Sequence, residues 1–404
     1  MNCRSCSSTS LQLVIDLGYQ PWGNDFQLIE NHIYTKKYPL ELYFCHNCTL
    51  TQLGFTVPKE IMFVSHSYLS GTTRTLRKHF EHVASEIINR FKPAPSCLIL
   101  DIGGNDGTFL EHFHNLGFRT LNIDSGTAQS QVSNEKGLPT INDFFSLESA
   151  SKILDSYGTV DIIHAAGILF HLENIHDAFN GIRLLLDKKG ILVAEFIYLP
   201  TMIEKTQYDQ IYHEHLLYYT LTSFQSLLLQ HELEIFDCEF FPIHGGTCIA
   251  YISHSNAYGL TRRLKKAFDD EIIKKVTHIE TMLKFSENVK NSGLALRSII
   301  DHLILEGKTI FALGAPVKGS TLLNYNRIDE KIVPFAVEKN LYKIGTYFPG
   351  TKIEVIEENF ANHPDVYLLL SWNFKDEILS NYADFLKNGG QVINPIPFPE
   401  IING

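Results

Sequence analysis

The sequence has no run of about 20 apolar residues, which is the length a transmembrane helix requires, so we expect no membrane span. It also has no excess of positive charge. The net charge is −11 at pH 7, and non-specific nucleic-acid binding needs a basic surface, so nucleic acid is not an expected partner. The N-terminal residues MNCRSCSS lack the apolar core of a signal peptide, and a cytoplasmic location is the default expectation.

The chain is long enough for two or three folded domains. It has 404 residues, 44% of them hydrophobic and 20% charged, which is typical of a folded, soluble protein. No fixed-period repeat is visible, but the pattern changes along the chain. We therefore divide it into residues 1–65, 66–257, 258–305 and 306–404. The sequence predicts no particular assembly, and a monomer is the default.

The second segment begins with a helical pattern and continues as alternating strands and helices. The stretch TLRKHFEHVASEIINRF places five apolar side chains on one helical face, namely Leu76, Phe80, Val83, Ile87 and Phe91. The runs CLILDIGG, RTLNIDSG, VDIIHAAGILF and GILVAEFIYL predict strands, and HDAFNGIRLLLDKKG predicts a helix closed by its glycine. This order predicts a parallel sheet covered by helices, followed by antiparallel strands in FFPIHGGTCIAYISH.

The last two segments predict a helical connector and a second α/β unit. Apolar positions recur three and four residues apart in 258–305, which predicts one or two long helices. From residue 308, TIFALGAPVKGS, VPFAVEK, VYLLLSW and QVINPI predict four strands with helices between them. The predicted fold class is therefore α/β, with two Rossmann-like units and a small N-terminal domain.

Four of the seven cysteines form two C-x-x-C pairs, Cys3 with Cys6 and Cys45 with Cys48. Four thiolates suit tetrahedral Zn²⁺, and each pair supplies two ligands at the right reach. Disulfides are unexpected in a cytoplasmic protein. A redox C-x-x-C is the lesser alternative, because no thioredoxin-like unit surrounds either pair. We expect a structural zinc ion without a catalytic role.

A glycine-rich turn follows the first predicted strand of the second segment. Its residues are Asp101, Gly103, Gly104, Asn105, Asp106 and Gly107. Neither G-x-G-x-x-G nor Gly-Lys-Ser/Thr is present, and the acids would repel phosphate. They suit a ligand with an amino group and a sulfonium, which is S-adenosylmethionine (SAM). Asp124, at the end of the next strand, is expected to bind the ribose hydroxyls. A tight turn with helix-capping side chains is the alternative without a ligand.

The stretch DQIYHEHLLYYTLTSF contains four polar, proton-competent side chains in succession, from Tyr212 to His215. On a strand, Tyr212 and Glu214 would share one face and His213 and His215 the other. On a helix or turn, Tyr212 and His215 would come together. The sequence does not decide between these. A zinc site at His213 and His215 is a weaker interpretation, since the H-E-x-x-H spacing is absent, and a polar loop is the remaining one.

These motifs resemble, in order, those of the three-domain nucleotide-sugar C-methyltransferases, which methylate a carbon of a keto-deoxysugar. The resemblance covers nearly the whole chain. It rests on CRSC, LGYQPWGNDF, YPLELYFCHNCTLTQL, SYLSGTT, DIGGNDGTFL, GILFHLENIHDAF, AEFIYL, YDQIYHEHLLYYTLTSF, PIHGGT, GAPVKGSTLLNY, KIGTYFPGT and LLSWNFKDEI.

The resemblance implies a role for each segment and for particular residues. Residues 1–65 would bind zinc, 66–257 would form the SAM-dependent methyltransferase domain, and 306–404 would bind the sugar nucleotide. The implied active-site positions are His171, Tyr212, Glu214 and His215, with His215 as general base. Tyr68 joins the implied cofactor contacts. The implied substrate contacts are Lys318, Asn324, Glu338 and Lys343, and Lys318 at the opening of a helix would suit a diphosphate.

The implied chemistry is proton removal next to a ketone, followed by methyl transfer to the enolate carbon. Histidine is the natural base, because its ordinary pKa leaves much of it neutral at pH 7. We expect Tyr212 to donate a hydrogen bond to the enolate or the sugar. Glu214 would orient a histidine or bind a sugar hydroxyl, and His171 would be a second acid/base or a partner of the enolate oxygen.

Two other functions fit parts of the pattern. One is O- or N-methylation of a sugar or small molecule, and the other is a zinc-ribbon binding module with a degenerate methyltransferase domain. The chain also departs from the family pattern. His66 stands where a tyrosine is usual, Gly167-Ile168 replaces Asn-Val, and Thr247-Cys248-Ile249 replaces Ser-Leu-Arg. These departures leave the sugar and the methylated carbon unassigned.

Overall fold

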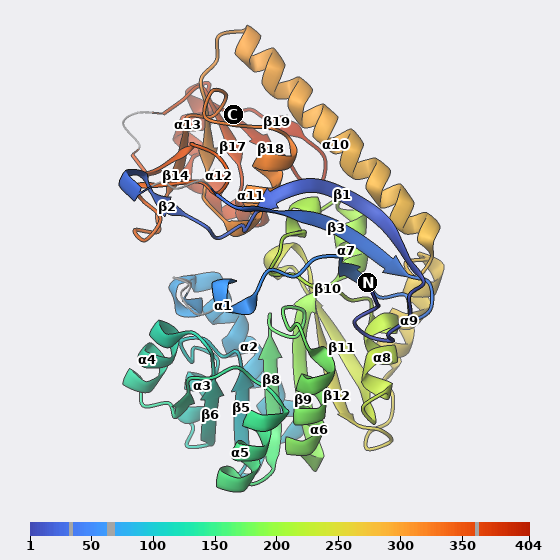
Figure 1. Cartoon of the computed structure of the whole chain (residues 1–404). Helices are drawn as coiled ribbons and strands as arrows, with labels where there is room; N and C mark the ends of the chain where they lie inside the picture. The colour runs from blue at the N-terminus through green and yellow to red at the C-terminus, as the bar shows by residue number, and fades with distance from the viewer. Residues whose placement is uncertain (32–34, 63–68, 360–362) are drawn as a thin grey trace.

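The structure of the chain is a computed structural model that describes residues 1–31, 35–62, 69–359 and 363–404 (Figure 1). In this view the first α/β unit lies below, the second lies above, and the long strands of the N-terminal domain cross between them. Tyr68, expected to contact the cofactor, and His66 lie outside the described residues.

The N-terminal domain is built on a small antiparallel sheet with the order β1-β3-β4-β10. The strands are β1 (Leu11–Pro21), β3 (Lys37–Cys45), β4 (Thr51–Leu53) and β10 (Leu217–Tyr218). Alternate residues of β3 are buried from Tyr38 to Phe44, as expected for a strand with one face in the core. The fourth strand, β10, comes from the middle of the chain and pairs with β4. The domain is therefore complete only with residues of the first α/β unit.

The first α/β unit contains a seven-stranded sheet in the order β7-β6-β5-β8-β9-β12-β11. The strands are β5 (Leu98–Ile102), β6 (Arg119–Ile123), β7 (Thr140–Ile141), β8 (Val160–Ala166), β9 (Leu186–Ile197), β11 (Leu233–Phe241) and β12 (Thr247–His254). The first five run parallel, and β12 lies antiparallel between β9 and β11. The strand order reverses between β5 and β8, and open parallel sheets bind ligands at the carboxyl ends of such a pair.

Helices cover both faces of this sheet, because successive strand residues point to opposite sides. Ile99 and Ile162 pack with α2 and α3 on one face, and Leu100 and Ile163 pack with α5, α6 and α8 on the other. The helices of this unit are α2 (Arg74–Phe91), α3 (Leu110–His114), α4 (Thr127–Glu135), α5 (Leu147–Tyr157), α6 (Ile175–Leu185), α7 (Leu199–Glu204) and α8 (Leu221–Leu229). The result is the sandwich of helices and parallel sheet that the sequence predicts.

The second α/β unit contains an eight-stranded sheet in the order β19-β18-β17-β13-β14-β16-β15-β2. Its own strands are β13 (Ile310–Leu313), β14 (Phe335–Glu338), β15 (Thr346–Tyr347), β16 (Glu354–Glu357), β17 (Val366–Leu369), β18 (Gln391–Asn394) and β19 (Glu400–Ile402). The five central strands are parallel. The helices are α11 (Val317–Tyr325), α12 (Lys375–Asn381) and α13 (Ala383–Lys387). The edge strand β2 (Gln27–Leu28) belongs to the N-terminal domain and pairs with β15.

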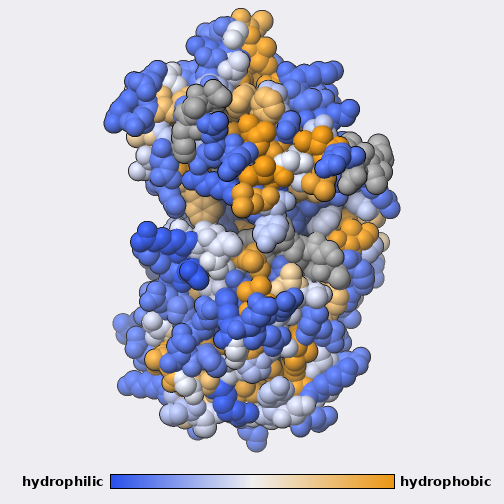
Figure 2. All heavy atoms as spheres, turned by 90° about the vertical axis from the view of Figure 1, so that its left-hand side faces the viewer, coloured by the Kyte–Doolittle hydropathy of each residue, from blue (hydrophilic) through white to orange (hydrophobic). Residues whose placement is uncertain are grey.

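The two α/β units are joined by α9 (Arg262–Ile273) and α10 (Ile279–Leu305), and α10 runs along one side of the molecule (Figure 1). The N-terminal domain contributes β2 to one sheet and receives β10 from the other unit, so it links both. The space-filling view shows the surface drawn in at the waist between the two units (Figure 2). None of the helices in the described part of the chain is long and apolar enough to cross a bilayer.

The fold class is confirmed, and the details add corrections. The predicted apolar face of α2 is buried at Leu76, Phe80, Val83 and Ile87, with Phe91 half-buried. The helix α6 was expected to close at a glycine near residue 190, but it ends at Leu185 and β9 begins at the next residue. The strands β15, β16 and β19 were not predicted, because they are short and lack a clear alternation.

Glu271 on α9 attaches the connector to the first α/β unit. It is buried, and its carboxylate accepts hydrogen bonds from the Tyr198 hydroxyl at 2.6 Å, from the Leu221 N–H at 2.6 Å, and from the Thr222 N–H and hydroxyl at 2.9 and 2.6 Å. These backbone donors belong to the first turn of α8, so Glu271 caps that helix from another element.

We predict that Glu271→Ala destabilises the protein by on the order of 3 kcal/mol, because several buried donors lose their acceptor. A lowered thermal midpoint, measured by calorimetry, checks this. Asp270→Ala is the matched control on the same helix, since Asp270 is exposed. Equal midpoints for the two variants would contradict the assigned role of Glu271.

Candidate active site

The four cysteines of the N-terminal domain form one cluster. Cys3 Sγ lies 3.5 Å from Cys48 Sγ, Cys6 Sγ lies 3.6 Å from Cys45 Sγ, and all four sulfur atoms lie within 4.8 Å of one another. Tetrahedral zinc with Zn–S bonds of about 2.3 Å separates its sulfur ligands by about 3.8 Å. The cluster therefore fits zinc as a closed site with four protein ligands, which is the structural type.

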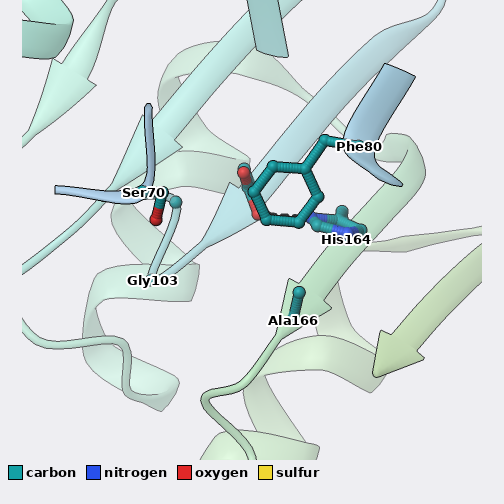
Figure 3. Close-up of a pocket in the computed structure, with 7 residues that line it drawn as sticks. Ser70, Phe80, Gly103, His164 and Ala166 are labelled. Atoms are coloured by element: carbon teal, nitrogen blue, oxygen red, sulfur yellow. Dashed lines mark hydrogen bonds and ion pairs between the residues drawn. The ribbon is translucent and has the colours of Figure 1, made fainter. Parts of the chain in front are cut away.

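The glycine-rich turn lies at the carboxyl end of β5, beside the carboxyl end of β8. A small pocket opens there, lined by Ser70, Phe80, Asp101, Gly103, Gly104, His164 and Ala166 (Figure 3). Three of these residues, Asp101, Gly103 and Gly104, belong to the predicted SAM loop. A Cβ atom at Gly104 would lie 2.7 Å from the Asp101 carboxylate, so glycine is required for the turn to pass this close.

Asp101 is held by a histidine that the sequence analysis missed. His164 on β8 is buried, its ring stacks on Phe109 with a centroid distance of 3.6 Å, and its Nδ1 donates to Asp101 Oδ1 at 2.7 Å. Asp101 Oδ2 makes no hydrogen bond within the described residues. The pocket therefore presents a carboxylate oxygen among uncharged walls, which fits the ammonium group and sulfonium of SAM.

Asn105 and Asp106 of the turn, and Asp124 at the end of the next strand, are held by hydrogen bonds to the backbone and to nearby side chains. Asp124 accepts from the Asn105 N–H at 2.9 Å and from the Gly126 N–H at 2.7 Å. Asn105 Oδ1 accepts from the Ser70 N–H at 3.0 Å. Asp106 Oδ2 accepts from the Gly71 N–H at 3.0 Å, and its Oδ1 accepts from the Thr108 hydroxyl at 2.6 Å. Asn105 and Asp106 thus hold the chain at residues 70 and 71 over the pocket.

Gly107 completes the turn. Its φ of 74° is in the left-handed region, and a Cβ atom would lie 2.4 Å from Leu138, so glycine is required.

The stretch from Tyr212 to His215 is a turn, which settles the alternative that the sequence left open. The His215 N–H donates to the Tyr212 carbonyl at 2.9 Å. The Tyr212 and His215 rings are in contact, with a centroid distance of 3.8 Å and an interplanar angle of 39°, and the His171 ring, from the loop after β8, lies 5.1 Å from His215. His213 points away and packs edge-on against Tyr38 of the N-terminal domain. The structure therefore brings together three of the predicted catalytic residues and separates His213 from His215.

His215 has a defined tautomer. Its Nδ1 lies 2.8 Å from the Gln210 carbonyl, which can only accept, so Nδ1 carries the proton and Nε2 carries the lone pair. Burial and the nearby His171 lower the pKa of His215 well below its ordinary value of 6.5. The ring is therefore neutral at pH 7, in the protonation state that a general base requires.

Glu214 lies where the three domains meet. Its Oε1 accepts from the indole N–H of Trp22, in the N-terminal domain, at 2.7 Å. Desolvation raises the pKa of Glu214 to about 7, and the Trp22 hydrogen bond and Lys343 of the second α/β unit act in the opposite direction. Glu214 is thus shared between protonated and ionised forms near neutral pH.

Three of the predicted substrate residues surround the turn between β13 and α11. Lys343 Nζ donates to the Ala315 carbonyl at 2.7 Å, and Glu338 Oε2 accepts from the Ala315 N–H at 2.7 Å. Lys318 is the second residue of α11, and burial lowers its pKa to about 8. Burial also lowers the pKa of Lys343 to about 8. Two poorly hydrated ammonium groups therefore lie at the start of one helix.

Asn324, the fourth predicted substrate residue, makes hydrogen bonds within the second α/β unit. It lies near the end of α11, and its side-chain amide donates to the Pro349 carbonyl at 3.0 Å and to the Ser320 carbonyl at 2.9 Å. It supports the turn at Gly350, where a Cβ atom would lie 2.5 Å from Asn324.

The two tryptophans were not among the predicted site residues. They are the only ones in the chain, and both donate their indole N–H to acids of the stretch that contains the predicted base. Trp22 binds Glu214, and Trp372 of the second α/β unit binds Asp209 at 2.6 Å. Their rarity was the available signal, but the sequence does not show which acids they meet.

Three family models match consecutive parts of the chain. They are described as a putative zinc binding domain at residues 3–63, a methyltransferase domain at residues 76–237 and a C-methyltransferase C-terminal domain at residues 242–397. A curated relative, the C-methyltransferase NovU of Streptomyces niveus, is 27% identical over 405 residues, covering 99% of this chain and 96% of the relative.

Solved structures similar to this chain include two methyltransferases. Magnesium protoporphyrin IX methyltransferase from Synechocystis with bound SAM is 12% identical with a TM-score of 0.34, over 44% of this chain and 79% of that chain. The plantazolicin methyltransferase BpumL in complex with SAH is 16% identical with a TM-score of 0.34, over 44% of this chain and 82% of that chain.

We predict that the purified protein contains one zinc ion per chain and that Cys45→Ser loses it, because the thiolate ligand is removed. Elemental analysis measures the metal, and calorimetry is expected to show a lowered thermal midpoint. Cys97→Ser is the control, since Cys97 lies outside the cluster. Full zinc occupancy in Cys45→Ser would contradict the four-thiolate site.

Proposed function

The chain belongs to the three-domain SAM-dependent C-methyltransferases with an N-terminal zinc-binding domain, and from this premise we propose that it methylates a carbon of a nucleoside-diphosphate keto-deoxysugar. The observation that carries the proposal is the Tyr212–His215 turn, in which a neutral histidine lies against His171 of the loop after β8 while Glu214 interacts with Lys343 of the second α/β unit. The product would be a branched sugar.

His215 is the proposed base. Carbon becomes nucleophilic when a proton next to the ketone is removed, since the charge spreads onto the ketone oxygen as an enolate. His215 Nε2 carries the lone pair that takes this proton, because Nδ1–H is bound to the Gln210 carbonyl. This carbonyl is also well placed to stabilise the imidazolium that forms, so the ring keeps its orientation through the proton transfer.

Tyr212 and His171 are the proposed donors to the enolate oxygen. Both rings lie against His215, so groups that donate hydrogen bonds lie beside the group that removes the proton. Donors aimed at the developing negative charge stabilise the transition state more than the ketone. Glu214, oriented by Trp22, is the proposed contact to a sugar hydroxyl, since it can accept or donate near neutral pH.

Bound SAM supplies an electrophilic methyl group on its sulfonium sulfur. Asp101 Oδ2 would accept from the ammonium group of the ligand, and His164 keeps that carboxylate turned into the pocket. In the second α/β unit, Lys318 and Lys343 would bind the diphosphate of the sugar nucleotide at the start of α11, where the helix dipole also favours anions.

We predict that the protein, without SAM, exchanges solvent deuterium into the carbon next to the ketone of its substrate. His215→Asn should slow this exchange, and methyl transfer with SAM, by about 10²- to 10⁴-fold, because the base is lost. Mass spectrometry with a panel of nucleoside-diphosphate 4-keto-deoxysugars measures both. His213→Asn is the neighbouring control, since its ring faces the N-terminal domain.

The outcomes separate the alternatives. Methyl transfer without deuterium exchange would indicate O- or N-methylation and contradict the enolate route. Failure to bind SAM in calorimetry would favour a binding module with a degenerate methyltransferase domain. SAM binding without transfer to any sugar carbon would rule out the proposed substrate class.

A further inference from the structure

Asp209 is a buried carboxylate without an assigned role. It lies in a single 3-10 turn, η3 (Tyr208–Gln210), three residues before Tyr212, and its side chain has no exposed surface. Its Oδ2 accepts from the Trp372 indole N–H at 2.6 Å, and its Oδ1 is buried and makes no hydrogen bond in the described part of the chain. A buried anion with one free oxygen is costly unless a cation lies near it.

The cation near Asp209 is Lys318 of the C-terminal domain. Its Nζ lies 3.8 Å from the centre of the Trp372 ring and donates to the Asn373 side chain. The Trp372 indole thus meets Lys318 with its face and Asp209 with its N–H. Asp209 is also the group whose charge raises the pKa of Lys318, against the burial that lowers it to about 8.

Trp372 reaches this position only because a glycine lies beneath it. Gly245, in the turn η4 (Ile243–Gly245) between β11 and β12 of the first α/β unit, has φ of 93°, and a Cβ atom there would lie 2.5 Å from the Trp372 ring. Two segments of the first α/β unit, η3 and η4, therefore contact η5 (Trp372–Phe374) of the second α/β unit. The surroundings of Lys318 are complete only when the two domains are docked.

We propose that Asp209 is a positioning residue that holds Lys318 charged and in place through Trp372, so that diphosphate binding depends on docking of the C-terminal domain against the methyltransferase domain. The inference rests on the proposed function, in which Lys318 binds the diphosphate. Asp209 also lies three residues before the Tyr212–His215 turn. The hydrogen bond between Trp372 and Asp209, which positions Lys318, therefore also holds the segment that carries His215.

If Asp209 has this role, the affinity for diphosphate should depend on pH in a way that changes when the Asp209 charge is removed. Asp209 faces it from η3 and His244 from η4, while Trp372 and Asn373 on η5 are uncharged. Removing the Asp209 charge lowers the pKa of Lys318 further, because the carboxylate favours the ammonium form. Lys318 then loses its proton at a lower pH, and diphosphate affinity should be lost at that lower pH.

The test is calorimetric binding of nucleoside diphosphates to the full chain from about pH 7 to about pH 10. The probe is whichever of ADP, GDP, CDP, UDP and dTDP binds the wild type most tightly. We expect the affinity of Asp209→Asn to decline about one pH unit earlier than that of the wild type, since asparagine keeps the acceptor for Trp372 without the charge. Asp209→Asn/Lys318→Arg should not show this earlier decline, because arginine stays charged, and should keep only the decline that Lys343, whose pKa burial lowers to about 8, contributes in every variant. Asp376→Asn is the control, an exposed acid of the same domain.

Trp372→Phe is the second variant and covers the case in which Asp209→Asn does not fold. This variant keeps a ring beneath Lys318 and removes the N–H that stabilises the Asp209 anion. The affinity for nucleoside diphosphate should therefore again fall at a lower pH than in the wild type. The positioning role would be overturned if Asp209→Asn bound nucleoside diphosphate more weakly at every pH but lost affinity at the same pH as the wild type. Unchanged affinity in Lys318→Gln would instead overturn the proposed diphosphate contact itself.

Discussion

The structure depends on one short segment that is held in place by both of the other domains. Residues 207–215 belong to the methyltransferase domain, but Trp22 binds Glu214 from the N-terminal domain. From the C-terminal domain, the Thr321 hydroxyl donates to the Ile211 carbonyl at 2.8 Å and the Asn326 amide donates to the Tyr208 hydroxyl at 2.8 Å. A turn of this kind has no regular secondary structure to keep it rigid, so its geometry is set by these tertiary contacts.

Burial shifts the pKa values of the ionisable groups around this segment in the direction that favours their uncharged forms. Desolvation raises the pKa of Glu214 and of Asp209, and it lowers the pKa of Lys318, Lys343 and His215. Glu214, with a pKa of about 7, and Lys318 and Lys343, with pKa values of about 8, are held near the pH at which they change charge, so a charged ligand can shift their protonation at small cost. The site is organised to respond to the charge of what enters it.

The sequence predicted the parts of the molecule that rest on local patterns. The apolar face of α2, the alternation of strands and helices, and the turn after β5 follow from periodicity and from glycine, because neighbouring residues determine them. The cysteine cluster was also predictable, because two C-x-x-C pairs supply four thiolates, which suit a tetrahedral zinc ion. The contacts of Asp209 with Trp372 and of Glu214 with Trp22 join residues far apart in the chain, and no local pattern indicates them. The short strands β2 and β10 escaped prediction for the same reason.

The shared strands also affect how the chain can fold while it is being synthesised. The sheet of the N-terminal domain needs β10, which lies more than 150 residues after β4, and β2 finds its partner β15 only when the last domain has appeared. The pairing of β1, β3 and β4 can form early, but this domain cannot complete its contacts as soon as it leaves the ribosome. Its four thiols emerge early, with an incomplete sheet around them. The sheet of this domain is completed only after β10 has been made, and β2 is paired only after β15 has been made.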